Sequence, residues 1–236
     1  MCIMEYYVSE QHEKRRRMFP HYNFGSNSEY YIFVCEHCKN EKRVRKMSYT
    51  STKSIYWSDG KIEACNDWPI SYMQRCPHCG KYYYVSIEEA QTGFGTDIED
   101  DGRLEIGEYA ALCSDKKMME SLPIENMASL LMQYVQQYND TYRRGAQAEE
   151  NEEKATYEQS KMFTDAILFL TERCRIPEIL IADLYRQAGM FRKCMEYAAD
   201  IVNRIKGEDL ETLDRTRMLA IQGNTKPFIT KKENFI

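Results

Sequence analysis

The sequence predicts an α+β protein in which a small β domain precedes an all-helical array. Aromatic and β-branched residues, which suit strands, are frequent in residues 29–86, and two Cys-x-x-Cys motifs lie within this segment. After residue 107, apolar residues recur at the three- and four-residue steps of helices. These changes define four regions: an N-terminal segment (1–28), the β domain (29–90), an acidic, glycine-containing linker (91–107) and the helical domain (108–236).

The strands of the β domain are predicted next to its cysteine motifs. One strand, at 30–34, directly precedes the first motif, and another, at 81–85, directly follows the second. Between them, residues 54–57 and 61–64 flank the turn sequence Ser-Asp-Gly at 58–60. An Asp-Gly pair between strand-like runs is a strong hairpin signal, because glycine readily adopts the positive φ of a tight turn. We expect this hairpin to be an insertion between the two motifs.

Five apolar stripes predict the helices of the C-terminal part. Start and stop signals bound several of them, since Pro123 and Pro177 lie where helices begin and Gly145 and Gly189 lie where helices end. The predicted helices cover residues 124–142, 163–174, 177–188, 191–205 and 208–222. The sequence therefore predicts an array of helices joined by short turns.

The composition is that of a globular protein, with 43% hydrophobic and 29% charged residues in a chain of 236. No run approaches the roughly 18 apolar residues that span a bilayer, and the first residues lack the basic-then-apolar order of a signal peptide. We therefore expect a cytoplasmic protein without a membrane partner. Residues 1–85 contain 13 Lys and Arg against 9 Asp and Glu, and the remaining residues contain 19 against 28. This imbalance is too small to predict nucleic-acid binding.

The two cysteine motifs carry the most specific chemistry in the sequence. They supply four thiolates from two tight turns: Cys35, Cys38, Cys76 and Cys79. Four thiolates in a tetrahedron form a closed structural zinc site, and cysteine pairs in a reducing compartment are more often metal ligands than structural disulfides. We therefore predict that these four residues hold one structural Zn²⁺ ion. With the tetrahedron complete, His37 and His78 are expected to face solvent.

The second motif resembles known families in two ways. Cys76-Pro-His-Cys79-Gly80 resembles the knuckle of zinc ribbons, in which the glycine lets the turn close and the cysteines bind zinc. Cys76-Pro-His-Cys79 also resembles the active-site motif of thioredoxin-like oxidoreductases, which implies thiol–disulfide exchange as an alternative. In that family the first cysteine begins a helix, whereas a tyrosine-rich, strand-like run follows Gly80 here.

The helical part contains a further resemblance. Residues 182–191, together with Cys194, resemble the middle of a tetratricopeptide unit in the spacing of small residues, Tyr185, Gly189 and Phe191. The pattern departs from that family at Ala198 and has no second copy at a 34-residue offset. The whole plan resembles bacterial proteins that join a zinc ribbon to such helices, which implies an architecture but no reaction.

Two weaker patterns suggest other ligands. Residues 97–108 follow the spacing of an EF-hand calcium loop, but the preceding segment contains Gly93 and Gly95 where a helix is needed, so an acidic surface loop is the favoured interpretation. The basic clusters 14–17 and 39–46, with aromatic residues nearby, could contact nucleic acid, although a solvated charged face explains them equally well.

No catalytic constellation is recognisable in the sequence. It contains no Gly-x-Ser-x-Gly, no phosphate-binding glycine loop and no His-Glu-x-x-His, and all four histidines precede residue 80. We expect a non-enzymatic zinc protein that acts as a scaffold for a protein partner. The alternatives are a nucleic-acid-binding regulator that uses the basic part of the β domain, and an oxidoreductase that uses Cys76 and Cys79.

Overall fold

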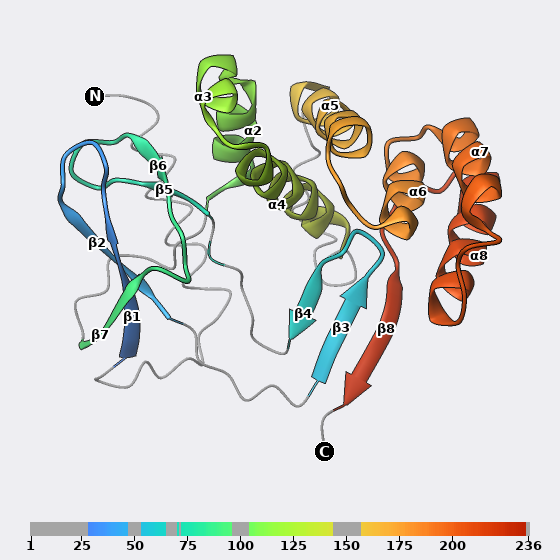
Figure 1. Cartoon of the computed structure of the whole chain (residues 1–236), viewed down its shortest axis with the longest axis horizontal. Helices are drawn as coiled ribbons and strands as arrows, with labels where there is room; N and C mark the ends of the chain where they lie inside the picture. The colour runs from blue at the N-terminus through green and yellow to red at the C-terminus, as the bar shows by residue number, and fades with distance from the viewer. Residues whose placement is uncertain are drawn as a thin grey trace, which may run out of the picture.

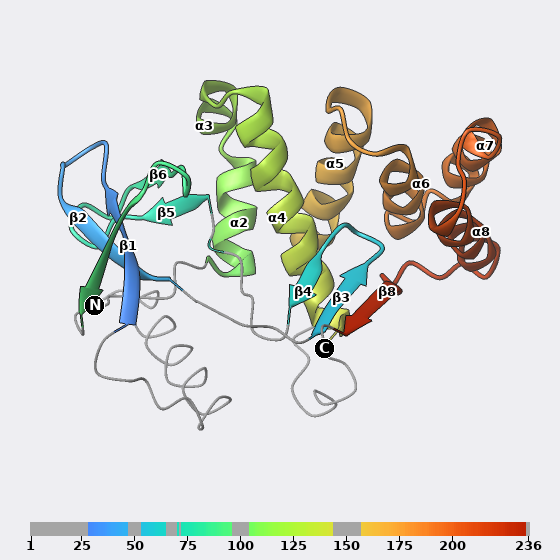
Figure 2. The ribbon, with the colours of Figure 1, turned by 60° about the horizontal axis from the view of Figure 1, so that its bottom comes forward.

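The computed structural model describes residues 28–46, 53–64, 70, 72–95, 104–143 and 157–234. Within this part of the chain there are three antiparallel sheets and seven helices (Figure 1). Two sheets lie at one end of the molecule, and the helices extend from them toward the other end (Figure 2). The predicted α+β class, with β structure before helices, is confirmed.

The first sheet is built on the hairpin that carries the first cysteine motif. Its three strands are β1 (Ser28–Val34), β2 (Glu41–Arg45) and β7 (Gln91–Gly95), in the order β2-β1-β7. Tyr30 of β1 is paired with Gly93 of β7, and its ring lies across that residue. A Cβ atom at position 93 would lie 2.7 Å from the ring, so only glycine leaves room for it. The predicted linker thus begins with a strand of this sheet.

The second sheet is the hairpin that carries the second cysteine motif. It consists of β5 (Met73–Arg75) and β6 (Tyr82–Tyr84), and the motif forms the connection between them. A buried hydrogen bond joins this hairpin to the first sheet, because Lys42 Nζ of β2 donates to Gln74 Oε1 of β5 over 2.9 Å. A small apolar core lies around the motifs: Phe33, Val44, Ile70, Tyr83 and Val85.

The third sheet combines residues from opposite ends of the chain. The predicted hairpin is present as β3 (Lys53–Trp57) and β4 (Ile62–Ala64), but the third strand is β8 (Ile229–Asn234), in the order β4-β3-β8. The hairpin lies between the two motifs in the sequence, as predicted, but it pairs with the C-terminal strand and not with the two sheets that carry the motifs. The C-terminal part is therefore not helical throughout. Hydrogen bonding explains the difference, since β3 pairs with β8 along its whole length, with one register shift between Tyr56 and Trp57.

Seven helices follow the second sheet and pack largely on their neighbours in sequence. They are α2 (Ile106–Ser114), α3 (Lys116–Ser121), α4 (Ile124–Arg143), α5 (Tyr157–Arg173), α6 (Glu178–Gln187), α7 (Phe191–Ile201) and α8 (Glu208–Ile221). The main core lies between α2, α4 and α5, where Leu130, Tyr134 and Ile167 are fully buried. A smaller core of Ala182, Ala198, Ile201 and Leu213 joins α6, α7 and α8. Each of the five predicted helices corresponds to one of α4 to α8.

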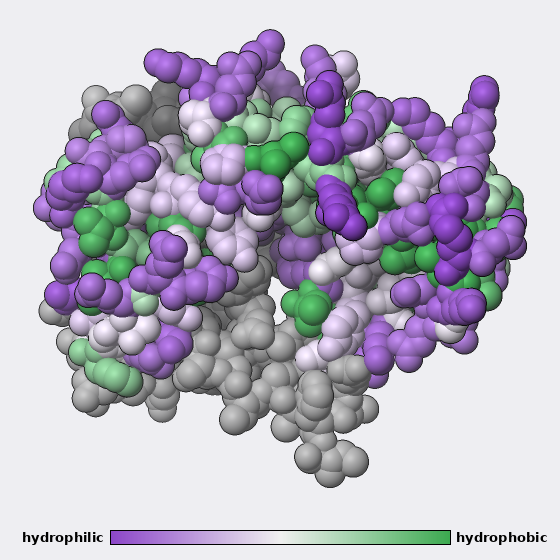
Figure 3. Space-filling view, viewed as in Figure 1, coloured by the Kyte–Doolittle hydropathy of each residue, from purple (hydrophilic) through white to green (hydrophobic). Residues whose placement is uncertain are grey.

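The visible surface is mostly hydrophilic, with separate hydrophobic patches, one of them over α7 and α8 (Figure 3). Met218 and Ile221 of α8 contribute exposed apolar side chains, with 60% and 75% of their surface accessible. None of the helices in the described ranges is long and apolar enough to cross a bilayer.

Candidate metal centre

The four predicted cysteines meet at one point. The Sγ atoms of Cys35, Cys38, Cys76 and Cys79 all lie within 4.8 Å of one another. Cys35 Sγ is 3.7 Å from Cys79 Sγ, and Cys38 Sγ is 3.5 Å from Cys76 Sγ. A tetrahedral metal with sulfur ligands at about 2.3 Å places its sulfurs about 3.8 Å apart, whereas a disulfide requires about 2.05 Å. The four side chains are therefore spaced to hold one metal ion.

The two motifs form knuckles with the same backbone hydrogen bonds. In the first, the amide of Cys35 donates to the carbonyl of Asn40, and the amide of Lys39 donates to the carbonyl of Cys35. The second repeats this pattern from Cys76, with Gly80 in the place of Lys39. Each knuckle closes a hairpin, so two rigid strand pairs set the positions of the four sulfurs.

The environment of the sulfurs is asymmetric. Cys35 and Cys76 are buried, whereas Cys38 is partly exposed and Cys79 is exposed. Hydrogen bonds from the backbone and side chain of Asn40 lower the pKa of Cys38 to about 6. At Cys79 the Lys81 backbone lowers the pKa, but partial desolvation and the neighbouring thiols outweigh it and raise that pKa to about 11. Of Cys38 and Cys79, Cys38 is thus the thiol better prepared to bind a metal as thiolate.

The two histidines inside the motifs lie outside the sulfur cluster. Both His37 and His78 are exposed, as predicted. His37 Nε2 is 3.0 Å from the carbonyl oxygen of Tyr82, which can only accept, so this nitrogen carries the hydrogen. This bond connects the first knuckle to the strand after the second and braces the two against each other.

The geometry offers little support for thiol–disulfide exchange at Cys76 and Cys79. Both residues lie in a β-hairpin turn between β5 and β6, so no helix N-terminus is available to activate Cys76. The cysteines outside the motifs are also unsuited to that reaction within the described residues. Burial raises the pKa of Cys113 to about 12 and that of Cys194 to about 11, which makes both inert thiols, as the sequence predicted.

The basic cluster 39–46 is largely engaged within the protein. Lys42 of β2 is buried and donates to Gln74 of the second sheet, and Lys46 Nζ forms an ion pair of 2.7 Å with Glu29. The guanidinium of Arg43 lies 5.4 Å above the ring of Tyr30, whose face is thereby covered. These contacts leave few basic side chains for phosphate, and the other basic cluster, 14–17, lies outside the described residues.

The predicted calcium loop is only partly covered by the described residues, which begin again at Leu104. Its last ligand position, Glu108, has other partners. One carboxylate oxygen accepts from the backbone amide of Glu105 over 2.9 Å, in a capping box that begins α2, and the other accepts from the Tyr82 hydroxyl over 3.0 Å. Glu108 therefore joins the cysteine hairpin to the helices.

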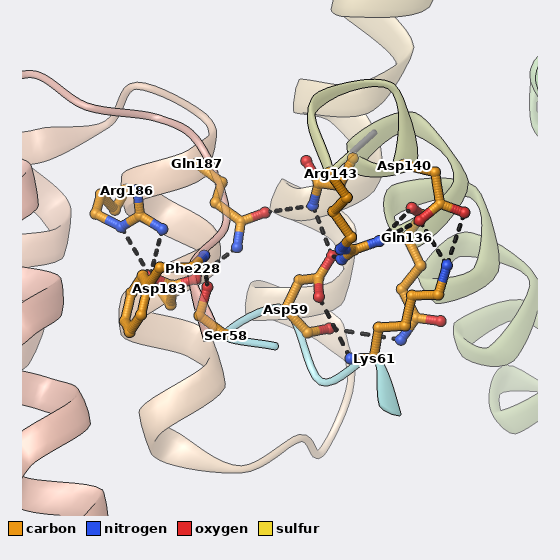
Figure 4. Close-up of polar contacts among 11 residues, drawn as sticks. Ser58, Asp59, Lys61, Gln136, Asp140, Arg143, Asp183, Arg186, Gln187 and Phe228 are labelled. Atoms are coloured by element: carbon orange, nitrogen blue, oxygen red, sulfur yellow. Dashed lines mark hydrogen bonds and ion pairs between the residues drawn. The ribbon is translucent and has the colours of Figure 1, made fainter. Parts of the chain in front are cut away.

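A buried polar cluster that was not predicted from the sequence lies behind the β3–β4 turn (Figure 4). Asp59 of this turn is fully buried and forms an ion pair with Arg143 of α4. Arg143 also pairs with Asp140, whose carboxylate accepts from Lys61 Nζ at 2.5 and 2.7 Å. A charged residue in a turn normally faces water, so only the three-dimensional packing identifies this cluster.

The cluster continues into α6 through side-chain amides. Asn139 donates to Asp59 over 2.8 Å and to Gln187 over 2.7 Å, and Gln187 donates to Asp183 over 2.5 Å. Asp183 also accepts from Arg186, which donates in turn to carbonyl groups near the start of β8. The polar cluster thus fixes the third sheet against α4 and α6.

Comparison with known proteins adds no family to these observations. No protein-family model matches the chain, and neither a curated protein nor a solved structure matches it. The chemistry of the cysteine centre and the arrangement of the helices therefore carry the functional argument.

Proposed function

We propose that this is a non-enzymatic cytoplasmic zinc protein in which one structural Zn²⁺ ion organises the β part and the helices bind a protein partner. The observation that carries the proposal is the convergence of four cysteine sulfurs at tetrahedral spacing. Thiolates are soft ligands that select zinc among the common cytoplasmic divalent ions when the geometry is tetrahedral. Four protein ligands leave no open position for substrate or water, so the ion has a structural role.

The size of the β core supports a structural role for zinc. The apolar cluster around the motifs contains five buried residues besides Cys35 and Cys76. Such a small core provides little stability without a metal or another cross-link. Structural zinc contributes roughly 10–16 kcal/mol in small domains, and this energy is coupled to folding. Cys76 and Tyr83 share the core with Phe33 of the first hairpin, so the ion would hold the two hairpins together.

The helical part supports a role in protein binding. The α6–α7 hairpin turns at Gly189, with φ of 71°, and buries Ala182 and Cys194 at the positions that resemble a tetratricopeptide unit. Arrays of helical hairpins present extended surfaces for partners, and their terminal helices are normally polar on the outside. The exposed Met218 and Ile221 on the last helix depart from that rule, which favours α8 as part of the contact surface.

A binding experiment with matched variants tests the scaffold proposal. Immobilised full-length protein should retain a specific partner from cell extract after nuclease treatment. The variant Ile221→Glu should lose most of this partner, because a charge replaces an exposed apolar side chain of α8. The variant Lys206→Glu, in the exposed turn before α8, should retain it. Retention that disappears with nuclease would support nucleic-acid binding instead, and equal retention by both variants would remove α8 from the interface.

A further inference from the structure

Strand β7 is an open edge of the first sheet. The strand order β2-β1-β7 pairs one side of β7 with β1, and no strand of the described ranges pairs with its other side. On the free side of an edge strand, the N–H and C=O groups of alternate residues are available to hydrogen-bond to an added strand. This edge lies at the opposite end of the molecule from α8 (Figure 1 and Figure 2), so it is separate from the partner surface proposed there.

Strand β7 lacks the features that protect the other edge strands from pairing. Proteins commonly block an edge with charged residues or proline, or keep the edge strand very short. Among the other edges in the described part of the chain, β2 and β8 contain several charged residues, and β4, β5 and β6 have only three residues each. The five residues of β7, Gln-Thr-Gly-Phe-Gly, include neither a charge nor a proline. Its edge is therefore the one best suited to accept a strand.

Contacts with β1 and β2 hold β7 in an extended conformation. The ring of Tyr30 lies across Gly93, and the guanidinium of Arg43 lies 5.4 Å from the centre of that ring. Five consecutive residue pairs join β1 to β7, from Ser28 with Gly95 to Ile32 with Gln91. A strand that is already fixed loses little conformational entropy when another strand adds to it.

An exposed aromatic side chain lies on this open edge. The side chain of Phe94 is 72% accessible, whereas most phenylalanine side chains are buried. Because side chains alternate along a strand, Phe94 shares its face with Thr92, and Gly93 and Gly95 lie on the other face with Tyr30. An apolar or β-branched side chain of an added strand would cover the Phe94 ring, and such cross-strand pairs stabilise sheets.

Charge next to the edge indicates the chemistry of the partner. Glu88 and Glu89 are exposed directly before β7, and no cation of the described residues forms an ion pair with either of them. A second copy of the chain would bring the same two carboxylates and the same net charge of −5, which disfavours pairing of β7 with itself. A strand followed or preceded by basic residues is attracted instead.

We propose that β7 accepts an extended segment of a partner protein, which adds as an antiparallel strand and places basic residues next to Glu88 and Glu89. Antiparallel pairing is slightly more stable than parallel pairing, and all pairs of this sheet are antiparallel. In this orientation the C-terminal end of the added strand lies beside the N-terminal end of β7, so its basic residues follow the strand. Main-chain hydrogen bonds provide the affinity, and Phe94 and the two carboxylates provide the selectivity.

Two isomeric peptides test the proposal on the full-length, zinc-loaded protein. Both are capped at their ends, and their sequences are Val-Thr-Val-Thr-Val-Lys-Lys and Lys-Lys-Val-Thr-Val-Thr-Val. By fluorescence anisotropy the first should bind about fivefold more tightly, because only its lysines reach the carboxylates and two exposed ion pairs together contribute about that factor. Its binding should slow hydrogen exchange in residues 91–95. No binding of either peptide at millimolar concentrations, or binding of the second as tight as that of the first, would overturn the proposal.

N-methylated forms of the first peptide test for strand addition. In each of two forms, methyl groups replace the amide hydrogens of alternate residues, so that one edge of the peptide can no longer donate. Only the form whose methylated edge faces β7 should lose binding. An equal effect of the two sets of methyl groups would contradict an added strand.

Three variants of the protein locate the binding. Phe94→Lys should weaken binding of the first peptide about tenfold, since it removes the aromatic contact and adds a like charge. Val34→Lys makes the same change at an exposed position of β1 beyond its pairing with β7, and should leave binding unchanged. Glu89→Lys should weaken binding of the first peptide and strengthen binding of its counterpart that ends in Glu-Glu. If Phe94→Lys fails to fold by circular dichroism, this charge reversal decides, and an unchanged preference for the lysine peptide would refute the assignment.

Discussion

Lys39 and Gly80 occupy the same position in the two cysteine knuckles, and both have left-handed backbone conformations, with φ of 62° and 72°. Each amide donates a hydrogen bond to the carbonyl of the first cysteine of its motif, which closes the turn. Glycine adopts this conformation freely, whereas a side chain such as that of Lys39 costs roughly 1–2 kcal/mol there. The first knuckle therefore holds its cysteines at an energetic cost that the second avoids.

This relationship predicts opposite effects for two substitutions. Gly80→Ala should destabilise the zinc-loaded protein by about 1–2 kcal/mol, because a Cβ atom at this position meets no neighbour within 4 Å and only the backbone conformation opposes it. Lys39→Gly should be neutral or stabilise by up to about 1 kcal/mol, since relief of strain offsets the entropy that glycine gains on unfolding. Denaturant unfolding of both variants checks this, and a stabilising Gly80→Ala would contradict the shared turn geometry.

The asymmetric thiols predict an order of reactivity. Consider the reduced, metal-free protein at pH 7. This pH is above the pKa of Cys38, about 6, so Cys38 is mainly thiolate. It is far below the pKa of Cys79, about 11, so Cys79 stays protonated. Cys38 should therefore react with iodoacetamide first, although Cys79 is the more exposed. Raising the pH toward the pKa of Cys79 should narrow the difference in labelling rate between the two thiols, because a larger fraction of Cys79 becomes thiolate.

Peptide mass mapping of timed samples measures this order, and the zinc-loaded protein provides the control. All four motif cysteines should be protected there, because metal-bound thiolates are unavailable to the reagent. The variant Asn40→Ala should slow labelling of Cys38, since the hydrogen bond from its side chain over 3.4 Å is lost. Labelling of Cys79 before Cys38 would contradict the proposed role of Asn40.

The buried polar cluster predicts a large effect of Asp59. Asp59→Ala leaves Arg143 without one of its two carboxylate partners in the interior, which typically costs about 3–5 kcal/mol. The matched control is Asp200→Ala, which removes an exposed ion pair with Arg204 and should cost at most about 1 kcal/mol. Thermal and denaturant unfolding measure the loss of stability in the two variants. A loss in Asp59→Ala as small as that in Asp200→Ala would show that the cluster adds nothing to stability.

The pairing of β8 with β3 predicts that the C-terminal strand is required for stability. Removing residues 228–236 deletes β8 and Phe228, whose buried ring lies 4.6 Å from the guanidinium of Arg215. Loss of a buried phenylalanine alone costs about 3–5 kcal/mol, and the exposed edge of β3 should promote aggregation. Light scattering and melting temperature measure both effects. Removal of residues 235–236 alone should change neither the light scattering nor the melting temperature. A protein that lacks residues 228–236 and is still stable and monomeric would contradict the role of β8.

Local features of the chain were predictable because their cause is local. The spacing of Cys35, Cys38, Cys76 and Cys79 specifies the ligand set, and the Asp-Gly pair at 59–60 specifies the hairpin turn. Apolar periodicity likewise located α4 to α8, whose buried faces form the helical cores. In each of these cases the physical signal lies within one or two short segments of the sequence.

The long-range features were not predictable for the same reason. Ser54 pairs with Glu233, which lies 179 positions away in the sequence, and nothing in either short strand identifies the other as its partner. The buried position of Asp59 depends on Arg143, which lies 84 positions away. Gly93 is part of a predicted linker, but in the structure it lies in strand β7, in contact with the ring of Tyr30. Packing between distant segments determines these features, and single-sequence patterns do not report it.

The most direct measurement of the central proposal is the metal content of purified full-length protein, determined by mass spectrometry together with its count of free thiols. We predict one zinc ion per chain, and its loss in Cys76→Ser, with all nine cysteines reduced. The matched variant Cys174→Ser, which changes a thiol outside the cluster, should retain the ion. A chain without metal whose motif cysteines are joined as disulfides would contradict the account.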